Sequence, residues 1–171
     1  MATLNGLSDV TWDSASSASI HFGATKVSLT KLAPAKVTIK TDKIGSVGSM
    51  LPNRRTPGKA EIGDFSFELL ATDYQAHILP RMPKMGGTMV EFQITARLAH
   101  PTIAGSLEVL LDKVRIVEID GPELDGSEKA VIYKCNANAM NRHDRGSDGK
   151  WKSLAWDTSR PSAEAQALMK F

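Results

Sequence analysis

The sequence predicts a mainly β fold: a β-sandwich or an open β-barrel of antiparallel strands, with one short packed helix and long loops. Two observations lead to this prediction. Several segments alternate apolar and polar residues with a period of two, which is the pattern of strands that bury one face. Glycine- and proline-containing loops separate these segments, and a single stretch between them has a convincing helical period.

The strands follow from this alternation and from their β-branched residues. The predicted strands are Thr25–Leu32, Lys36–Thr41, Lys59–Leu70, Thr88–Ala99, Gly105–Ile119, Glu128–Ala137 and Trp151–Trp156, with a short one near Ile20–Phe22. In Thr88–Ala99, the residues Val90, Phe92, Ile94, Ala96 and Leu98 share the apolar face. In Gly105–Ile119 the alternation slips at Leu110–Asp112, which predicts a bulge or a change of sheet.

The helix is expected between the third and fourth of the long strands. Thr72 or Asp73 is expected to cap it through a side-chain oxygen, and Pro80 ends the run. Tyr74, His77 and Ile78 would share one helical face.

The loops and ends carry the remaining expectations. Residues 1–171 are expected to form a single domain. A flexible N-terminal arm is expected at residues 1–23, which are rich in Ser, Ala, Thr and Gly. A C-terminal tail is expected at residues 157–171, with a helical turn at Ala163–Met169. A solvent-exposed polar loop is expected at Asn141–Lys150. Residues 44–58 hold three glycines and two prolines, and a loop of that length is usually functional or ordered by a partner.

Composition excludes several classes of protein. The chain has 171 residues, of which 42% are hydrophobic and 23% charged. No run of about 18 apolar residues is present, so no membrane span is expected, and no secretory signal is expected at the start. The single cysteine, Cys135, excludes an internal disulfide and a zinc site built mainly from cysteines.

The charges are segregated along the chain. Residues 26–60 carry eight Lys/Arg against one Asp, whereas residues 61–128 carry twelve Asp/Glu against five Lys/Arg. The basic segment of one copy could contact the acidic segment of another copy, or the basic segment could bind nucleic acid. The simpler alternative is that the strands carry these charges on their solvent-exposed faces. Residues 24–60 contain no Phe, Tyr or Trp, which disfavours recognition by base stacking and leaves contact with phosphates open.

The sequence contains no catalytic motif that would predict an enzyme. No phosphate-binding loop and no nucleophile elbow is present. His143 and Asp144 are interpreted as part of a wet turn, and Cys135, which lies mid-strand, as a buried structural thiol. We therefore expect no catalytic residue, cofactor or metal, although an enzyme whose site is built from distant residues remains an alternative class.

The order of elements resembles the tail tube proteins of bacteriophages, particularly those of contractile tails. The resemblance covers about Ile20–Trp156: paired strands, the long Gly/Pro loop, the segment Thr56–Glu68 (TPGKAEIGDFSFE), a short helix, two long strands and an Asp/Gly-rich turn. It implies a β-barrel or sandwich that forms hexameric rings, which stack into a hollow tube around a tape-measure protein and later conduct DNA.

Further expectations follow from this resemblance. The partners would be other copies, the sheath, the tape-measure protein, and the baseplate and tail terminator proteins, and the protein would lie in the virion tail after assembly in the host cytoplasm. Two alternatives are the inner tube of a type VI secretion system and a tail completion or adaptor protein that forms one ring.

Candidate contact residues can be named under this interpretation. Arg54 and Arg55, with the apolar Met50 and Leu51, are expected to make contacts between rings, although Met50 and Leu51 could instead fold back on their own core. Two sets are expected to line the lumen, because acidic or neutral polar side chains let DNA slide: Glu91, Gln93 and Thr95, and Glu108 and Asp112. The alternative is that all five are ordinary solvent-facing strand positions.

Overall fold

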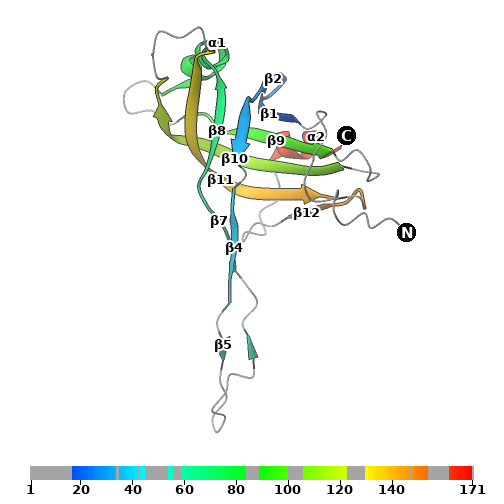
Figure 1. Ribbon diagram of the computed structural model, residues 1–171. Coiled ribbons are helices and arrows are strands. Elements are labelled where there is room, and N and C mark those ends of the chain that lie inside the picture. The colour runs from blue at the N-terminus through cyan, green and yellow to red at the C-terminus, as the bar shows by residue number, and fades with distance from the viewer. Residues whose placement is uncertain are drawn as a thin grey trace, which may run out of the picture.

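The structure is a computed structural model, and it describes residues 17–33, 35–41, 43–44, 54–55, 59–83, 89–99, 106–122, 130–146, 148–153 and 162–170. Its main feature is one antiparallel sheet with the strand order β2-β1-β9-β10-β11-β8-β3, and β12 also pairs with β11 (Figure 1). The strands are β1 (Ser17–Phe22), β2 (Thr25–Ser28), β3 (Lys31–Ala33), β8 (Phe65–Leu70), β9 (Phe92–Ala99), β10 (Ser106–Asp120), β11 (Ile132–Arg145) and β12 (Trp151–Ser153).

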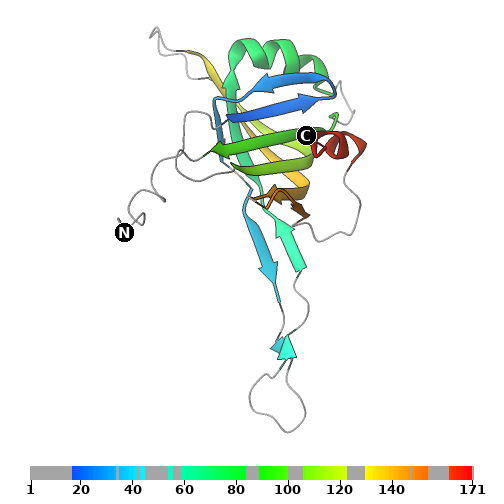
Figure 2. The ribbon, with the colours of Figure 1, turned by 90° about the vertical axis from the view of Figure 1, so that its right-hand side faces the viewer.

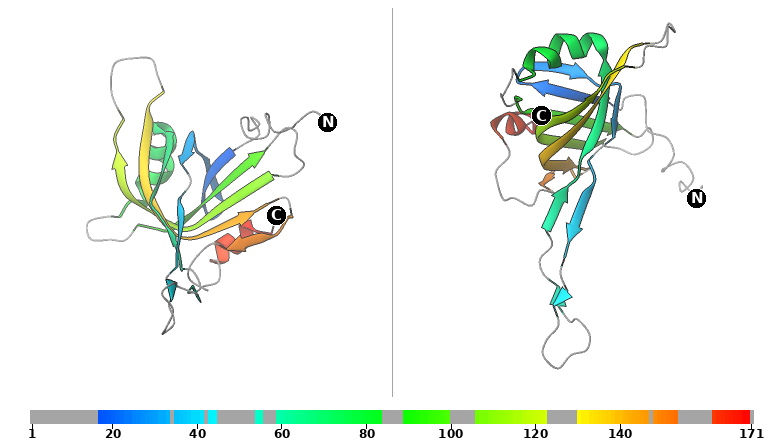
Figure 3. Two further views of the ribbon diagram at one scale, coloured as in Figure 1. Left: turned by 60° about the horizontal axis from the view of Figure 1, so that its bottom comes forward. Right: turned by 90° about the vertical axis from the view of Figure 1, so that its left-hand side faces the viewer.

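The sheet curls into a half-barrel (Figure 3). The end strands β2 and β3 are consecutive in the chain, and Leu29 and Thr30 form the corner between them. The Leu29 N–H donates to the Ala18 carbonyl of β1, whereas the Thr30 N–H donates to the Glu68 carbonyl of β8, each at 2.9 Å. The single strand predicted over Thr25–Leu32 is therefore divided, because it changes partner at this corner. The expected class, a mainly β open barrel with a short helix, is confirmed.

The two longest strands, β10 and β11, form a ribbon that bends. In the half of the ribbon beside β8, Cys135 and Ala137 lie in the core and Ile116, the partner of Ala137, packs against it. In the half beside β9, Val109 and Leu111, which project from the opposite face of β10, lie in the core instead.

A bulge on β10 produces this exchange of faces. Pairing with β9 shifts register between Leu111 and Val114, and Lys113 has a φ of 52°. The irregularity predicted at Leu110–Asp112 is confirmed. Leu110 and Asp112 are thereby placed on the surface opposite Val109 and Leu111.

The helical segment Ala71–Arg81 consists of α1 (Ala71–Asp73), a π-helical turn η2 (Tyr74–Ile78) and a 3-10 turn η3 (Leu79–Arg81). Tyr74 stacks on Tyr133 of β11 with ring centroids 4.0 Å apart, and Ile78 is fully buried. The expected cap by Thr72 or Asp73 is wrong: the helix begins directly after β8, and the Ala71 N–H donates to the Val131 carbonyl instead.

The core fills the curled sheet with aromatic and β-branched side chains. Phe67 and Phe92 meet edge to face with centroids 6.3 Å apart, and Phe22 lies 5.1 Å from Phe92. Val90, expected on the same face as Phe92, is exposed because β9 begins only at Phe92. Among the described residues, no helix is long and apolar enough to cross a membrane.

One predicted loop belongs to a strand. Asn141–Arg145, expected as the start of a wet polar loop, continue β11 in register with Glu108–Asp112 of β10. His143 is 2% exposed rather than wet. β12 pairs with this part of β11, with Ser153 opposite His143. A second helix, α2 (Ala163–Leu168), begins at Ser162, which is bonded to Asp112 on the neighbouring strand, and it corresponds to the helical turn expected at Ala163–Met169.

Candidate assembly surfaces

A two-stranded arm projects from the sheet (Figure 2). It is formed by β4 (Val37–Lys40) and β7 (Lys59–Ile62), which pair only with each other, and continues into β5 (Lys43–Ile44) and β6 (Arg54–Arg55). Within the predicted loop 44–58, the described residues Ile44, Arg54 and Arg55 therefore belong to paired strands. Met50 and Leu51 lie outside the described residues, and the backbone alone is described for Arg54 and Arg55.

The arm has little support from the rest of the protomer. Ile39 is 65% exposed although it lies in the middle of β4, and Thr38 and Lys40 are exposed as well. Lys40 and Glu61 form an ion pair across the two strands, but both side chains are largely in solvent, where such pairs contribute little. An isolated two-stranded hairpin is marginally stable in water, so contact with another surface would stabilise the arm.

Within the part of the chain that the structure describes, the outer half of β10 has one edge without a strand partner. Pairing with β9 ends at Val114, and no described strand pairs with residues 115–120 on that side. Val117 in this stretch is 58% exposed. Unpaired backbone N–H and C=O groups on an exposed edge strand are a template for pairing with another chain.

The third surface is the face of β9, β10 and β11 that α2 covers. Asp112 is completely buried there, and its carboxylate accepts bonds from the Ser162 N–H (2.9 Å), the Ser162 hydroxyl (2.7 Å), the Lys113 N–H (2.9 Å) and the Gln93 amide (3.3 Å). The Ser162 hydroxyl in turn accepts from the Ala165 N–H and caps α2. Asp112 therefore anchors the start of α2 to the sheet.

The polar groups beside Asp112 are less well satisfied. Asn141 and His143 are 1% and 2% exposed, and among the described residues their Nδ2 and Nε2 atoms have no hydrogen-bond partner. A buried polar atom without a partner costs free energy. The attachment of α2 therefore depends on the bonds to Asp112 rather than on complete pairing of the polar surface below it.

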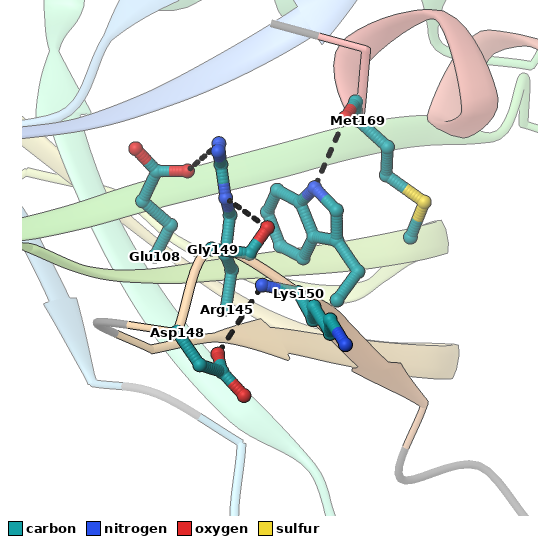
Figure 4. A network of polar contacts seen from close by, with 7 residues as sticks. Glu108, Arg145, Asp148, Gly149, Lys150 and Met169 are labelled. Carbon is teal, nitrogen blue, oxygen red and sulfur yellow. Dashed lines mark hydrogen bonds and ion pairs between the residues drawn. The ribbon is translucent and has the colours of Figure 1, made fainter.

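The other end of α2 is held by β12 and its turn (Figure 4). The Trp151 Nε1–H donates to the Met169 carbonyl at 3.1 Å, and the Arg145 guanidinium lies 5.9 Å from the Trp151 ring centre. Arg145 also donates to Glu108 (3.3 Å) and to the Gly149 carbonyl (3.0 Å). Gly149 has a φ of 69°, which glycine adopts without strain.

The structure divides the residues expected to line a lumen into two groups. Gln93 and Asp112 are buried beneath α2 rather than on a solvent-facing strand surface, because the bulge and α2 enclose them. Glu91, Thr95 and Glu108 are at least partly accessible. Glu91 pairs with Arg115 at 2.7 Å, Glu108 pairs with Arg145, and the Thr95 hydroxyl is hydrogen-bonded to His21 at 2.8 Å.

Nothing in the described residues suggests a catalytic centre. They include no group of three or more His, Cys, Asp or Glu side chains placed to hold a metal ion. Cys135 is fully buried in β11, and burial, with Asp120 nearby, raises the pKa of its thiol to about 12, so the thiolate nucleophile is not formed near neutral pH.

Replacing Asp112 by Asn should release α2. The variant keeps the size of the side chain but loses the charge that accepts the Ser162 bonds, and hydrogen bonds to a charged group contribute about 1.5–3 kcal/mol. We expect faster amide hydrogen exchange throughout Ala163–Leu168, measured by mass spectrometry. Asp120→Asn, an exposed carboxylate on the same strand, is the control. Equal exchange of α2 in Asp112→Asn and the native protein would refute the anchoring role.

Acidification should loosen the same region. Burial lowers the pKa of His143 despite the opposing charges of Asp112 and Asp144, so the unfolded state binds the proton more tightly and stability falls as the pH drops below about 6.5. Burial alone would raise the pKa of Asp112, but the bonds from Ser162, Gln93 and Lys113 lower it overall. The stability from Asp112 is therefore present above pH ~4 and is lost as the pH falls further.

Urea unfolding between pH 7 and pH 5 tests the His143 part of this prediction. His143→Gln should reduce the dependence of unfolding free energy on pH in that range, and the remaining slope should include His21, whose pKa is lowered by burial and by Lys26. A slope identical to that of the native protein would show that His143 does not titrate as described.

Comparison with known proteins finds a likeness in fold. No protein family and no curated protein matches the sequence. Among solved structures, a chain of the sheath-tube complex of PVC, an extracellular contractile injection system, in its extended state is 10% identical, with a TM-score of 0.60 over 85% of this chain and 99% of that one. A chain of the tube terminating cap of the anti-feeding prophage is 10% identical (TM-score 0.56; 75% and 87% covered), and one of its baseplate is 13% identical (0.54; 77% and 93%). The chain thus has the fold of tube-like proteins of contractile tails and injection systems.

Proposed function

We propose that this chain is a structural subunit of a phage tail tube, and that it forms hexameric rings stacked into a hollow tube through which DNA passes. The observation that carries the proposal is the β4–β7 arm, which extends away from the sheet with a largely exposed Ile39. The similarity in fold between this chain and chains of contractile injection systems supports the same proposal. A non-enzymatic role agrees with both observations.

Lateral contacts within a ring are assigned to the sheet margin. A copy that pairs with β10 residues 115–120 would satisfy the free backbone groups and cover Val117. Where the strand of the neighbouring copy is not β10 itself, the contact joins two different surfaces and is heterologous. Heterologous contacts generate closed rings or open helical filaments.

Contacts between rings are assigned to the arm. Residues 36–62 contain six Lys/Arg and two Asp/Glu, whereas residues 61–128 are predominantly acidic. The basic arm of one copy would meet acidic side chains of the next ring, with Arg54 and Arg55 forming ion pairs and Met50 and Leu51 adding apolar contact. Electrostatic contacts of this kind weaken as salt concentration rises.

Negative-stain microscopy of the purified chain tests the assembly. We expect long hollow tubes from the native protein, and rings or protomers from Arg54→Glu combined with Arg55→Glu, because like charges would then face each other. Lys152→Glu combined with Lys170→Glu changes the net charge equally at exposed sites outside the arm, and should leave tubes intact. Tubes of normal length and salt sensitivity from the Arg54/Arg55 variant would contradict the arm assignment.

The same images test one alternative function. A native protein that forms isolated rings and never tubes would be a tail completion or adaptor protein. Long tubes of the purified chain would fit the inner tube of a type VI secretion system as well as a phage tail tube. For a tail tube, the further partners are the sheath, tape-measure, baseplate and tail terminator proteins, in a virion tail assembled in the host cytoplasm.

The lumen lining is proposed for the accessible members of the expected set. Glu91, Thr95 and Glu108 belong to or adjoin β9 and β10, and the two carboxylates would weakly repel DNA phosphates. Because each is paired with an arginine, the surface would be close to neutral and would not hold the duplex. Gln93 and Asp112 could contribute only after α2 has moved.

Charge reversal tests this lining. Glu91→Lys combined with Glu108→Lys should slow DNA ejection from assembled particles, because a cationic lumen binds phosphates. Glu91→Gln combined with Glu108→Gln breaks the same ion pairs without adding positive charge and is the matched control. Normal ejection kinetics of the Lys variant in fully assembled tails would contradict the assignment.

A further inference from the structure

We propose that Arg142 is a positioning residue that fixes the direction of the β4–β7 arm by clamping the joint between the arm and the sheet. The inference rests on the proposed role of the arm in assembly and adds the device that orients it.

The joint is an interruption in one continuous ribbon. Ala33 pairs with Ser66 in the β3–β8 ladder, and Val37 pairs with Ile62 in the β4–β7 ladder, so the two ladders keep the same register across residues 34–36. Between them, the Gly63 N–H donates to the Lys36 carbonyl at 2.8 Å. The sequence also places Pro34 here, which has no N–H to donate. A two-stranded ribbon with few cross-strand bonds at one point can bend there.

The clamp comes from β11, which does not belong to this part of the ribbon. The Arg142 Nη1–H donates to the Ala35 carbonyl at 2.6 Å. Its Nε and Nη2 donate to the two carboxylate oxygens of Asp144 at 2.8 and 2.9 Å. One guanidinium thus connects the joint to the main sheet, while Asp144 holds that guanidinium in a single orientation.

Burial makes these bonds significant. Ala35 is 1% exposed, and the side chains of Arg142 and Asp144 are 18% and 24% exposed. A carbonyl buried to this extent needs a donor. Charge-assisted bidentate bonds are stronger than neutral hydrogen bonds. Without Arg142, the arm would remain attached through its two covalent connections and the base of β7 beside β11.

Gly63 lies opposite Lys36 at the joint. A Cβ at this position would lie 3.4 Å from the Lys36 carbonyl oxygen and 3.9 Å from the Lys36 Cβ, which are ordinary contact distances. The two strands therefore stay side by side where the ribbon passes from the sheet into the arm.

Lysine cannot reproduce the clamp. Its ammonium is a point donor, whereas Arg142 uses three nitrogens in a planar fork to bind two acceptors at once. Arg142→Lys retains the charge and should still lose the orientation of the arm. A role in net charge alone would predict the opposite result for this variant.

Pulsed EPR distance measurements on the full chain test the proposal. Spin labels at Thr38→Cys on the arm and Ser153→Cys on β12 occupy exposed positions, and the native Cys135 is fully buried and shielded from labelling. We expect one narrow distance in the parent protein, and loss of that single narrow distance in Arg142→Ala and Arg142→Lys. Asp144→Asn, which frees the guanidinium, should broaden the distribution as well.

Arg115→Ala is the matched control, because it removes an arginine and an exposed ion pair on β10, away from the joint and from both labelled strands. It should retain the narrow distance. Unchanged distances in Arg142→Ala, with the sheet still folded by thermal unfolding and near-UV circular dichroism, would overturn the clamp. A broadened distance with normal tube formation would support the clamp and instead contradict the contact role of the arm.

Discussion

The bend in the β10–β11 ribbon is the constraint on which the other features depend. The bulge at Asp112–Lys113 lets the two halves of the ribbon turn opposite faces to the core. In the half beside β9, this exchange directs Leu111 inward, and its partner Arg142 lies on the same face. Asn141 and His143 are correspondingly directed toward α2. A regular ribbon would have placed Arg142 away from the arm and left the surface below α2 in solvent.

The same bend explains why the molecule buries a carboxylate. A fully buried charge is tolerated only with strong partners, and Asp112 has four donors, two of them from Ser162. Because these bonds link a bulge in the sheet to the start of a separate helix, they tie the C-terminal segment to the most distorted point of the fold. The surfaces proposed for assembly, on the arm and on the edge of β10 at residues 115–120, lie elsewhere on the sheet.

Local pattern predicted much of the architecture. The period-two alternation located most strands, and the doubled leucine at Leu110–Leu111 indicated the irregularity of β10. The polar run Asn141–Arg145 could not be assigned to a strand, because its pairing with β10 and its cover by α2 are both long-range. In the structure, Asn141 and His143 are buried while Arg142 and Asp144 lie on the other face of the strand. The sequence does not reveal this alternation, because all four residues are polar and a period of two is recognised from a contrast between apolar and polar residues.

The candidate assembly surfaces could be predicted only in part, because the contacts that form them join residues far apart in the sequence. The length of the 44–58 loop indicated a functional segment, but the strand pairing of its described residues depends on cross-strand partners that the glycines and prolines obscure. Gln93 and Asp112 fit the alternation of wet strand faces, and only the position of Ser162 reveals their burial. Arg142 acts through a carbonyl 107 residues away in the sequence, so no local motif could have indicated it.

Self-association underlies the proposed function, and sedimentation velocity across a wide range of protein concentrations measures it most directly. We expect the protomer to give way to a discrete ring species and then to much larger particles as protein concentration rises, with less association at high salt. A single protomer species that persists at all concentrations and at low salt would contradict the proposed function.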